Sequence, residues 1–288
     1  MEPRKLRWTL LPISLLIASI AHAQTARPIS PGQLIFNAPQ QGPMQVQWVK
    51  MGNWFLTSGG PGEMITLFGT GLGPAAGAQP TPDDSGMIGT RLSGVEVLVG
   101  PFSAPIVYAG STQVSAMVPY ELSTISADRV TVLVKYLGQS SNGIQVRQAV
   151  SAPGIFTANS SGTGPGAILN TDNSYNGPGN PAGKGSVVQI FLTGEGPTNP
   201  VGVTGKITTV SSTGLLTPQP VLPVTVTIDG QPADIRFYGE APGQVSGVLQ
   251  INAEVPQNAK SGEVPLVVTF SNGGSSFSTQ AGVTVSVR

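Results

Sequence analysis

Histidine and cysteine, which most often carry nucleophilic catalysis and transition-metal binding, are almost absent from this sequence. It contains no cysteine and one histidine, His22, inside an expected export signal. Triads of the Ser-His-Asp or Cys-His type, and zinc, copper or haem sites built on imidazole or thiolate, are therefore not expected. A serine–lysine dyad would need a Ser-x-x-Lys motif, and none frames Lys135, Lys184, Lys206 or Lys260.

Paired carboxylates could instead support glycoside hydrolysis, in which two acids flank the scissile bond. The acidic residues are scattered through loops and strand edges, and the only adjacent pair, Asp83-Asp84, lies in the Pro/Gly-rich stretch 80–89. We interpret that pair as a solvated turn. Only 6% of residues are aromatic, which leaves few rings for sugar platforms. We therefore expect no enzymatic activity and no cofactor.

Oxygen-bearing side chains recur at every second position of one loop, as they do in calcium-binding loops. The four residues are Asn170, Asp172, Ser174 and Asn176. The central glycine and terminal glutamate of an EF-hand are missing. An Asx-rich turn, whose side chains bond their own backbone, explains the same pattern. We favour the turn and keep calcium as the alternative.

Two tryptophans, Trp48 and Trp54, lie close together near the start of the expected mature chain. Exposed, they could stack against a sugar ring, whereas buried, they would cap a hydrophobic core. We favour burial because so short a segment needs large apolar anchors. The glycine-rich run 69–73 is not a phosphate loop, since it lacks the Walker lysine and no helix pattern follows it.

The first 23 residues have the pattern of a signal peptide. Three basic residues precede the apolar run 8–20, and Ala21-His22-Ala23 forms a small-x-small cleavage site. Cleavage after Ala23 would give a secreted, periplasmic or cell-surface protein, and an uncleaved anchor is the alternative. No later segment approaches the roughly 18 apolar residues that a membrane helix needs.

Charge and cysteine content narrow the class of protein. The whole sequence has 14 basic and 14 acidic residues, and losing the signal would leave a net charge of about −2. Without a basic patch, nucleic acid is not an expected partner. An exported chain without cysteine must depend on core packing alone, which is typical of bacterial secreted β-proteins.

Strand patterns dominate the rest of the sequence. Short alternating or β-branched runs are separated by clusters drawn from 38 glycines and 26 prolines, and no sustained helical periodicity appears. This spacing predicts an all-β fold of sandwich type. The clearest predicted strands are 64–68, 95–99, 130–134, 224–228, 264–270 and 283–287.

The predicted strands also repeat in order, which indicates two diverged copies of one unit. The matching blocks are 63–74 (EMITLFGTGLGP) with 186–197 (SVVQIFLTGEGP), 95–109 with 224–239 allowing one gap, and 113–119 (QVSAMVP) with 250–256 (QINAEVP). In these blocks we predict that Phe68 and Phe191 are core residues.

We divide the chain accordingly into tandem immunoglobulin-like β-sandwich units. Residues 60–157 form the first unit, 158–164 a Gly/Ser-rich linker and 165–288 the second unit. The preceding segment 24–59 is too short for its own core and should pack on the first unit.

Several of these motifs also carry family resemblances. From Ser151 onward, PGIFT, NPAGKG, LTGEGP and QINAEVP follow one another in an order that resembles the uncharacterised C-terminal domain family of soil acidobacteria such as Solibacter. The FGTGLG opening resembles immunoglobulin-type IPT/TIG domains, and segment 24–59 resembles a truncated BACON module. These resemblances imply an exported, often multi-domain protein, and they supply no catalytic residues.

The sequence therefore favours an exported, non-catalytic β-sandwich protein that acts in adhesion, scaffolding or extracellular assembly. Its partners would be a cell-surface protein or a polysaccharide. The alternative is a glycan-binding module that uses Trp48, Trp54 or the loops at one end of a sandwich.

Overall fold

The computed structural model describes residues 44–50, 59–209 and 217–288, and these residues form an all-β protein. Nearly all strand pairs are antiparallel, and the described helical structure is one short 3-10 helix, η1 (Tyr120–Thr124). The all-β prediction is confirmed. None of the described residues forms a helix long and apolar enough to cross a membrane. The expected signal peptide and Trp54 lie outside the described residues.

Residues 44–147, called the first half below, form two sheets that enclose one apolar core. One sheet has the order β1-β2-β7-β6, made of β1 (Gln45–Lys50), β2 (Met64–Thr70), β7 (Gln113–Met117) and β6 (Ile106–Ala109). The other has the order β10-β8-β4-β3, with β5 on β4 and β9 on β8. Its strands are β10 (Ile144–Arg147), β8 (Arg129–Tyr136), β4 (Val95–Val99), β3 (Arg91–Leu92), β5 (Phe102–Ala104) and β9 (Gln139–Ser140).

Residues 154–288, the second half, form another two sheets around a second core. One contains β11 (Gly154–Ile155), β14 (Val187–Thr193), β20 (Val248–Glu254) and β19 (Ile235–Glu240), with β13 (Ile168–Leu169) on β14. The other contains β12 (Gly164–Pro165), β23 (Val283–Val287), β21 (Gly262–Ser271), β17 (Val224–Ile228) and β18 (Gln231–Ala233), with β22 (Ser276–Ser278) on β21. A separate ribbon pairs β15 (Thr198–Asn199) with β16 (Gln219–Pro220).

The two halves share one topology. The order β2-β7-β6 in the first half matches β14-β20-β19 in the second, and β10-β8-β4 matches β23-β21-β17. The last strand of the first trio, β6 or β19, carries a β-bulge at the same place in both halves. Because the hairpins β4–β5 and β17–β18 have loops of equal length, no gap is needed to align them. The repeat read from the sequence is thus a repeat of strand order and register.

The predicted linker 158–164 is not a free connection in the structure. Strand β12 begins at Gly164 and pairs in parallel with β23, while β11 already pairs with β14. Ile155, assigned to the first unit from the sequence, is buried in the second core. The chain therefore passes between the halves at residues 148–153. The sequence did not predict this boundary, because β11 is only two residues long and too short to give a strand pattern.

The alternation of buried residues along β2 differs from the prediction. Leu67 is fully buried in the first core, whereas Phe68 points to the opposite face and is half-buried. On the equivalent strand β14, Ile190 and Leu192 fill the second core, and Phe191 packs into a third cluster between the halves. The prediction that Phe68 is a core residue was wrong, because a strand with apolar residues on both faces does not reveal which face is interior. Phe191 is buried as predicted, but it lies in the cluster between the halves and not inside the second sandwich.

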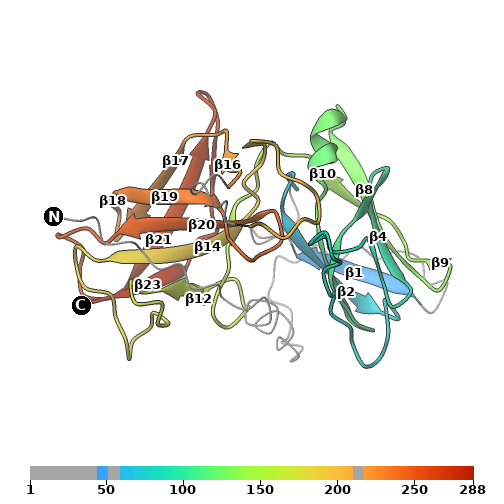
Figure 1. Cartoon of the computed structure of the whole chain (residues 1–288), viewed down its shortest axis with the longest axis horizontal. Coiled ribbons are helices and arrows are strands. Elements are labelled where there is room, and N and C mark those ends of the chain that lie inside the picture. Colours follow the sequence, from blue (N-terminus) through green and yellow to red (C-terminus); the bar gives the residue numbers. More distant parts are fainter. Residues whose placement is uncertain (1–43, 51–58, 210–216) are drawn as a thin grey trace.

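Figure 1 shows the two halves side by side along the long axis, with the strands of the second half coloured from yellow-green to red. Between them lies the third cluster of buried apolar side chains, called the interface core. Its members come from both halves: Met64, Ile88, Val107, Met117, Leu169, Phe191, Ala241, Val245 and Val248.

Candidate functional site

The best-defined cluster of polar side chains lies where the two halves meet, beside the interface core. Thr193, the last residue of β14, shows how closely the halves approach. Its hydroxyl accepts a hydrogen bond from Met64 N at 2.8 Å and lies 3.2 Å from Gly62 O and 3.0 Å from Gly247 O. Gly247 itself has a positive φ of 99°, and a Cβ there would sit 2.3 Å from Gly62 O. This contact needs glycine.

The Pro/Gly-rich loop 80–89 also crosses to the second half. Ile88 N donates to Gly205 O at 2.8 Å, and Ile207 N donates to Gly86 O at 2.7 Å. Asp83 shapes the loop by accepting hydrogen bonds from the Ser85 hydroxyl, Ser85 N and Met87 N. These bonds lower the pKa of Asp83, and the bond from the Ser85 hydroxyl contributes most. The prediction of a merely solvated turn was therefore incomplete: the Asp83 end is exposed, but the other edge of the loop pairs with 205–207.

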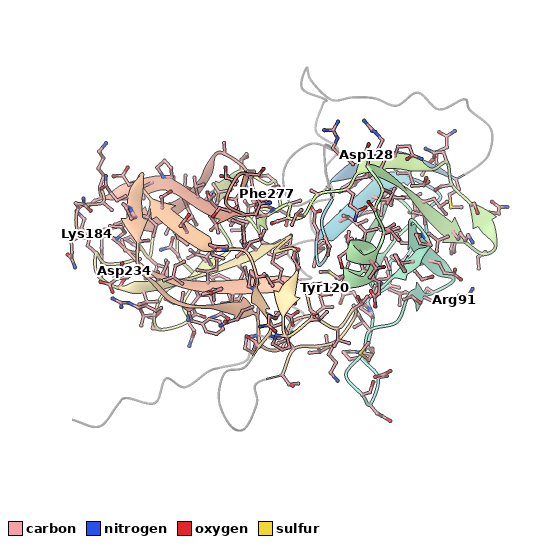
Figure 2. All side chains as sticks on the ribbon, turned by 90° about the horizontal axis from the view of Figure 1, so that it is seen from above. Arg91, Tyr120, Asp128, Lys184, Asp234 and Phe277 are labelled. Atoms are coloured by element: carbon pink, nitrogen blue, oxygen red, sulfur yellow. The ribbon has the colours of Figure 1, made fainter. Side chains whose placement is uncertain are left out.

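Tyr120, the first residue of η1, brings the first half into contact with two glutamates of the second. Its hydroxyl donates toward Glu195 Oε1, 2.6 Å away, and lies 3.0 Å from Glu240 Oε1. Its backbone N–H donates to Thr204 Oγ1 at 3.0 Å. Gly202 lies against the tyrosine, since a Cβ there would sit 2.5 Å from the ring. Figure 2 shows Tyr120 at the junction between the two groups of strands.

Glu240, at the end of β19, has further donors within its own half. Thr208 Oγ1 donates to Glu240 Oε2 at 2.7 Å, and Ser246 Oγ donates to Glu240 Oε1. Among the described residues, Glu195, two residues after β14, has Tyr120 as its one hydrogen-bond partner, and its buried Oε2 has none. We call Tyr120, Glu195, Glu240, Thr208 and Ser246 the Tyr120 cluster. The Glu240 carboxyl thus accepts several hydrogen bonds from protein donors, whereas the Glu195 carboxyl is near the Tyr120 hydroxyl alone among the described residues.

Burial controls the electrostatics of the Tyr120 cluster. Loss of hydration raises the pKa of the Glu195 carboxyl well above its usual value, and the neighbouring Glu240 raises it further, against a smaller lowering by the Tyr120 hydrogen bond. The same burial, with the two nearby carboxyls, raises the pKa of Tyr120 well above its usual value. Glu195 therefore holds its proton at pH values where an ordinary glutamate has lost it.

The closed environment limits what this cluster can do chemically. The exposed fraction is 0% for Glu195, 2% for Glu240 and 6% for Tyr120. Among the described residues, both carboxyls are closed off from solvent, and their hydrogen-bond partners lie at the junction. Among the described residues, no group of three or more His, Cys, Asp or Glu side chains is placed to hold a metal ion.

The Asn170–Asn176 loop has the bonding pattern of an Asx-rich turn. Asp172 Oδ1 accepts hydrogen bonds from the Ser174 hydroxyl and from Ser174 N, the latter at 3.0 Å. These two bonds lower the pKa of Asp172, and the hydroxyl contributes more. Asn176 binds β23 at both backbone atoms of Ser286, donating to its oxygen at 2.9 Å and accepting from its nitrogen at 2.8 Å. Asn170 Oδ1 accepts from Asn176 Nδ2 at 3.0 Å. These oxygens already have partners, which favours the turn over a calcium site.

The predicted glycan-stacking pair is described only in part. The Cα of Trp48 lies in β1 opposite Phe68 of β2. Among the described strands, β1 is at one end of the order β1-β2-β7-β6 and therefore forms an edge of this sheet. The side chain of Trp48 and the whole of Trp54 lie outside the described residues.

Sequence reasoning missed the Tyr120 cluster because its members are far apart in the chain. Tyr120 is 75 residues from Glu195 and 120 from Glu240. One signal was nevertheless present in the repeat: Glu195 stands where the first copy has Leu72. An acid at the position of an apolar core residue indicates a specialised contact.

Comparison with known proteins does not assign the chain to a family. No family model matches it, and neither does any curated protein. Among solved structures, the endo-fucoidan hydrolase MfFcnA4 from glycoside hydrolase family 107 is 15% identical with a TM-score of 0.18, over 81% of this chain and 28% of the hydrolase chain. The Streptococcus agalactiae AgI/II polypeptide BspA C-terminal domain is 11% identical with a TM-score of 0.19, over 83% of this chain and 99% of that one. Likenesses of this size carry no inference about activity or partners.

Proposed function

We propose that this protein is an exported, non-catalytic scaffold built from two tandem immunoglobulin-like β-sandwich units. Two observations support the architecture: each half encloses its own core between two sheets, and the strand order of one half repeats in the other. The signal-like N-terminus supports export to the periplasm, the cell surface or the medium. The acidobacterial and IPT/TIG resemblances are in keeping with the same proposal.

The observation that carries the scaffold proposal is the buried junction. Units joined only by a linker move independently, and small polar interfaces permit hinge motion. Here an apolar interface core, the loop 80–89 and the Thr193 hydroxyl, which contacts Met64 N and Gly62 O, all connect the halves. A rigid pair of sandwiches would hold whatever is attached to its two ends at one separation, as adhesion and assembly proteins require.

The function is tested by combining an activity screen with a binding screen. We expect no turnover by the purified protein on panels of glycosides, esters and peptides, and we expect retention on whole cells or on a surface fraction. Turnover that disappears in Glu195→Gln or Glu240→Gln would overturn the proposal, because it would show that the junction opens to a substrate.

Glycan binding through Trp48 and Trp54 is the alternative function, and it follows from the sequence alone. A polysaccharide pull-down with the wild type and Trp54→Ala distinguishes the two functions. Retention that is lost in the variant supports glycan stacking. Equal retention of both proteins would place glycan binding in the loops at one end of a sandwich, whereas no retention of either protein would count against glycan binding and favour the scaffold.

A further inference from the structure

We infer that the Tyr120 cluster is a proton-dependent latch, which keeps the two halves docked while Glu195 is protonated and loosens them when that proton is lost. The inference concerns how the halves stay together and does not depend on the proposed function. It rests on which oxygens meet at the junction and on how many protons they share.

Three oxygens meet at the junction, and they come from three separate segments. The Tyr120 hydroxyl belongs to the first half, and the Oε1 atoms of Glu195 and Glu240, at 2.6 and 3.0 Å from it, belong to the second. A phenol has one proton and can donate it to one acceptor at a time. A second proton is needed for both short contacts to be hydrogen bonds.

The second proton belongs on Glu195 and not on Glu240. Glu240 already receives hydrogen bonds from Thr208 and Ser246, which stabilise a carboxylate. Glu195 is fully buried, and no group of the described residues donates to its Oε2. When Glu195 is neutral, its acid proton points at the Tyr120 oxygen, and the tyrosine proton is then free for Glu240. The chain Glu195–Tyr120–Glu240 is complete in this state.

Loss of the Glu195 proton leaves two buried carboxylates competing for one hydroxyl. Among the described residues, the titratable groups that act on Glu195 are Glu240 and Tyr120, and neither supplies positive charge. On the neighbouring loop, the Lys206 ammonium donates to Ser85 O, and the exposed Glu121 accepts from Thr204. Among the described residues, the ion pairs involve only Arg91 and Arg236, neither of which is paired with Glu195 or Glu240. If Tyr120 moved away from Glu195 and Glu240, water could hydrate the two charges.

The direction of the pH effect follows from linkage. The pKa of Glu195 is higher in the folded protein than in the unfolded chain, so the folded state binds the extra proton between those two values. The stabilising effect of the proton is complete below the unfolded value and is lost as the pH rises through the folded value. Across that window, the folding equilibrium constant falls about tenfold per pH unit from this one group.

The test compares wild-type protein with Glu195→Gln, whose neutral amide keeps the shape and can still donate to the Tyr120 oxygen. Unfolding by urea and amide hydrogen exchange are followed from about pH 5 to about pH 10, with exchange corrected for its intrinsic pH dependence. We expect the wild-type folding constant to fall about tenfold per pH unit relative to the variant. We also expect peptides around Tyr120 and residues 202–207 to lose protection in the wild type only.

The matched control is Glu263→Gln, because Glu263 is exposed on β21. It should leave the wild-type pH profile unchanged. Parallel profiles for wild type and Glu195→Gln would overturn the latch.

Two further measurements keep the inference testable if Glu195→Gln does not fold. The first is a carbon-13 NMR titration of the glutamate carboxyls in the wild type, in which the assigned Glu195 resonance should titrate well above the ordinary value of a glutamate. A full set of ordinary glutamate titrations would refute the latch. The second uses Met87→Cys with Lys206→Cys, which replaces two residues facing each other across an antiparallel bridge between the halves. The oxidised pair should suppress the alkaline loss of protection, and the reduced pair should restore it.

Discussion

Glu195 occupies in the second half the place that Leu72 occupies in the first. Each residue follows a glycine with positive φ, Gly71 at 68° and Gly194 at 80°, just beyond the equivalent strands β2 and β14. Both are 0% exposed. Leu72 completes the first core, whereas Glu195 reaches Tyr120 of the other half. One position of the repeat thus serves the core in one copy and the junction in the other.

Because Leu67 and not Phe68 faces the first core on β2, the two adjacent residues should differ in their effect on stability. Leu67→Ala should destabilise the protein by about 2–5 kcal/mol, because Leu67 is fully buried between the sheets and the truncation leaves a cavity. Phe68→Ala should cost less, since Phe68 is only half-buried on the outer face. Urea unfolding of both variants checks this, and a larger loss for Phe68→Ala would show that the phase is still wrong.

Most of the fold could be read from the sequence, because alternation and turn residues act locally. The all-β class and the repeat follow from blocks such as LTGEGP, whose glycines permit the turn that ends each strand. The sequence did not reveal that Phe68 faces away from the first core, because β2 carries apolar residues on both faces. Nor did it reveal that Phe191, although buried as predicted, packs between the halves. The Tyr120 cluster was also out of reach, since it depends on how the halves dock.

The junction should depend on the Thr193 hydroxyl. Thr193→Val keeps the shape and removes the acceptor of Met64 N, leaving a buried N–H unpaired. We expect a loss of about 1–3 kcal/mol in the free energy of unfolding. Thr225→Val, on an exposed position of β17, is the control and should change stability by less than about 0.5 kcal/mol. Equal effects of the two changes would contradict the role given to Thr193.

Close packing around Tyr120 predicts that Gly202 tolerates no side chain. Gly202→Ala places a methyl group 2.5 Å from the tyrosine ring and 2.8 Å from Glu240 Oε1. Overpacking of this kind costs about 1–3 kcal/mol. Gly179→Ala is the matched control, because a Cβ added there would meet nothing within 4 Å and the change should be nearly neutral. A thermal midpoint for Gly202→Ala that equals the control would refute the packing described here.

The Asn170–Asn176 loop should be structural and insensitive to calcium. Asn176→Ala removes two hydrogen bonds to Ser286 and should cost about 1–3 kcal/mol. Asp172→Asn, on an exposed side chain, should leave the thermal midpoint unchanged. Millimolar calcium should not shift the midpoint of the wild type. A rise with calcium that disappears in Asp172→Asn would instead establish a cation site.

The central claim is that the two halves form one rigid body through a buried junction. Residual dipolar couplings of backbone amides, measured for both halves in one weakly aligning medium near neutral pH, test it most directly. A single alignment tensor should fit the couplings of residues 59–147 and 154–288 together. Two tensors of different magnitude, one for each half, would show that the halves move independently and would contradict the account.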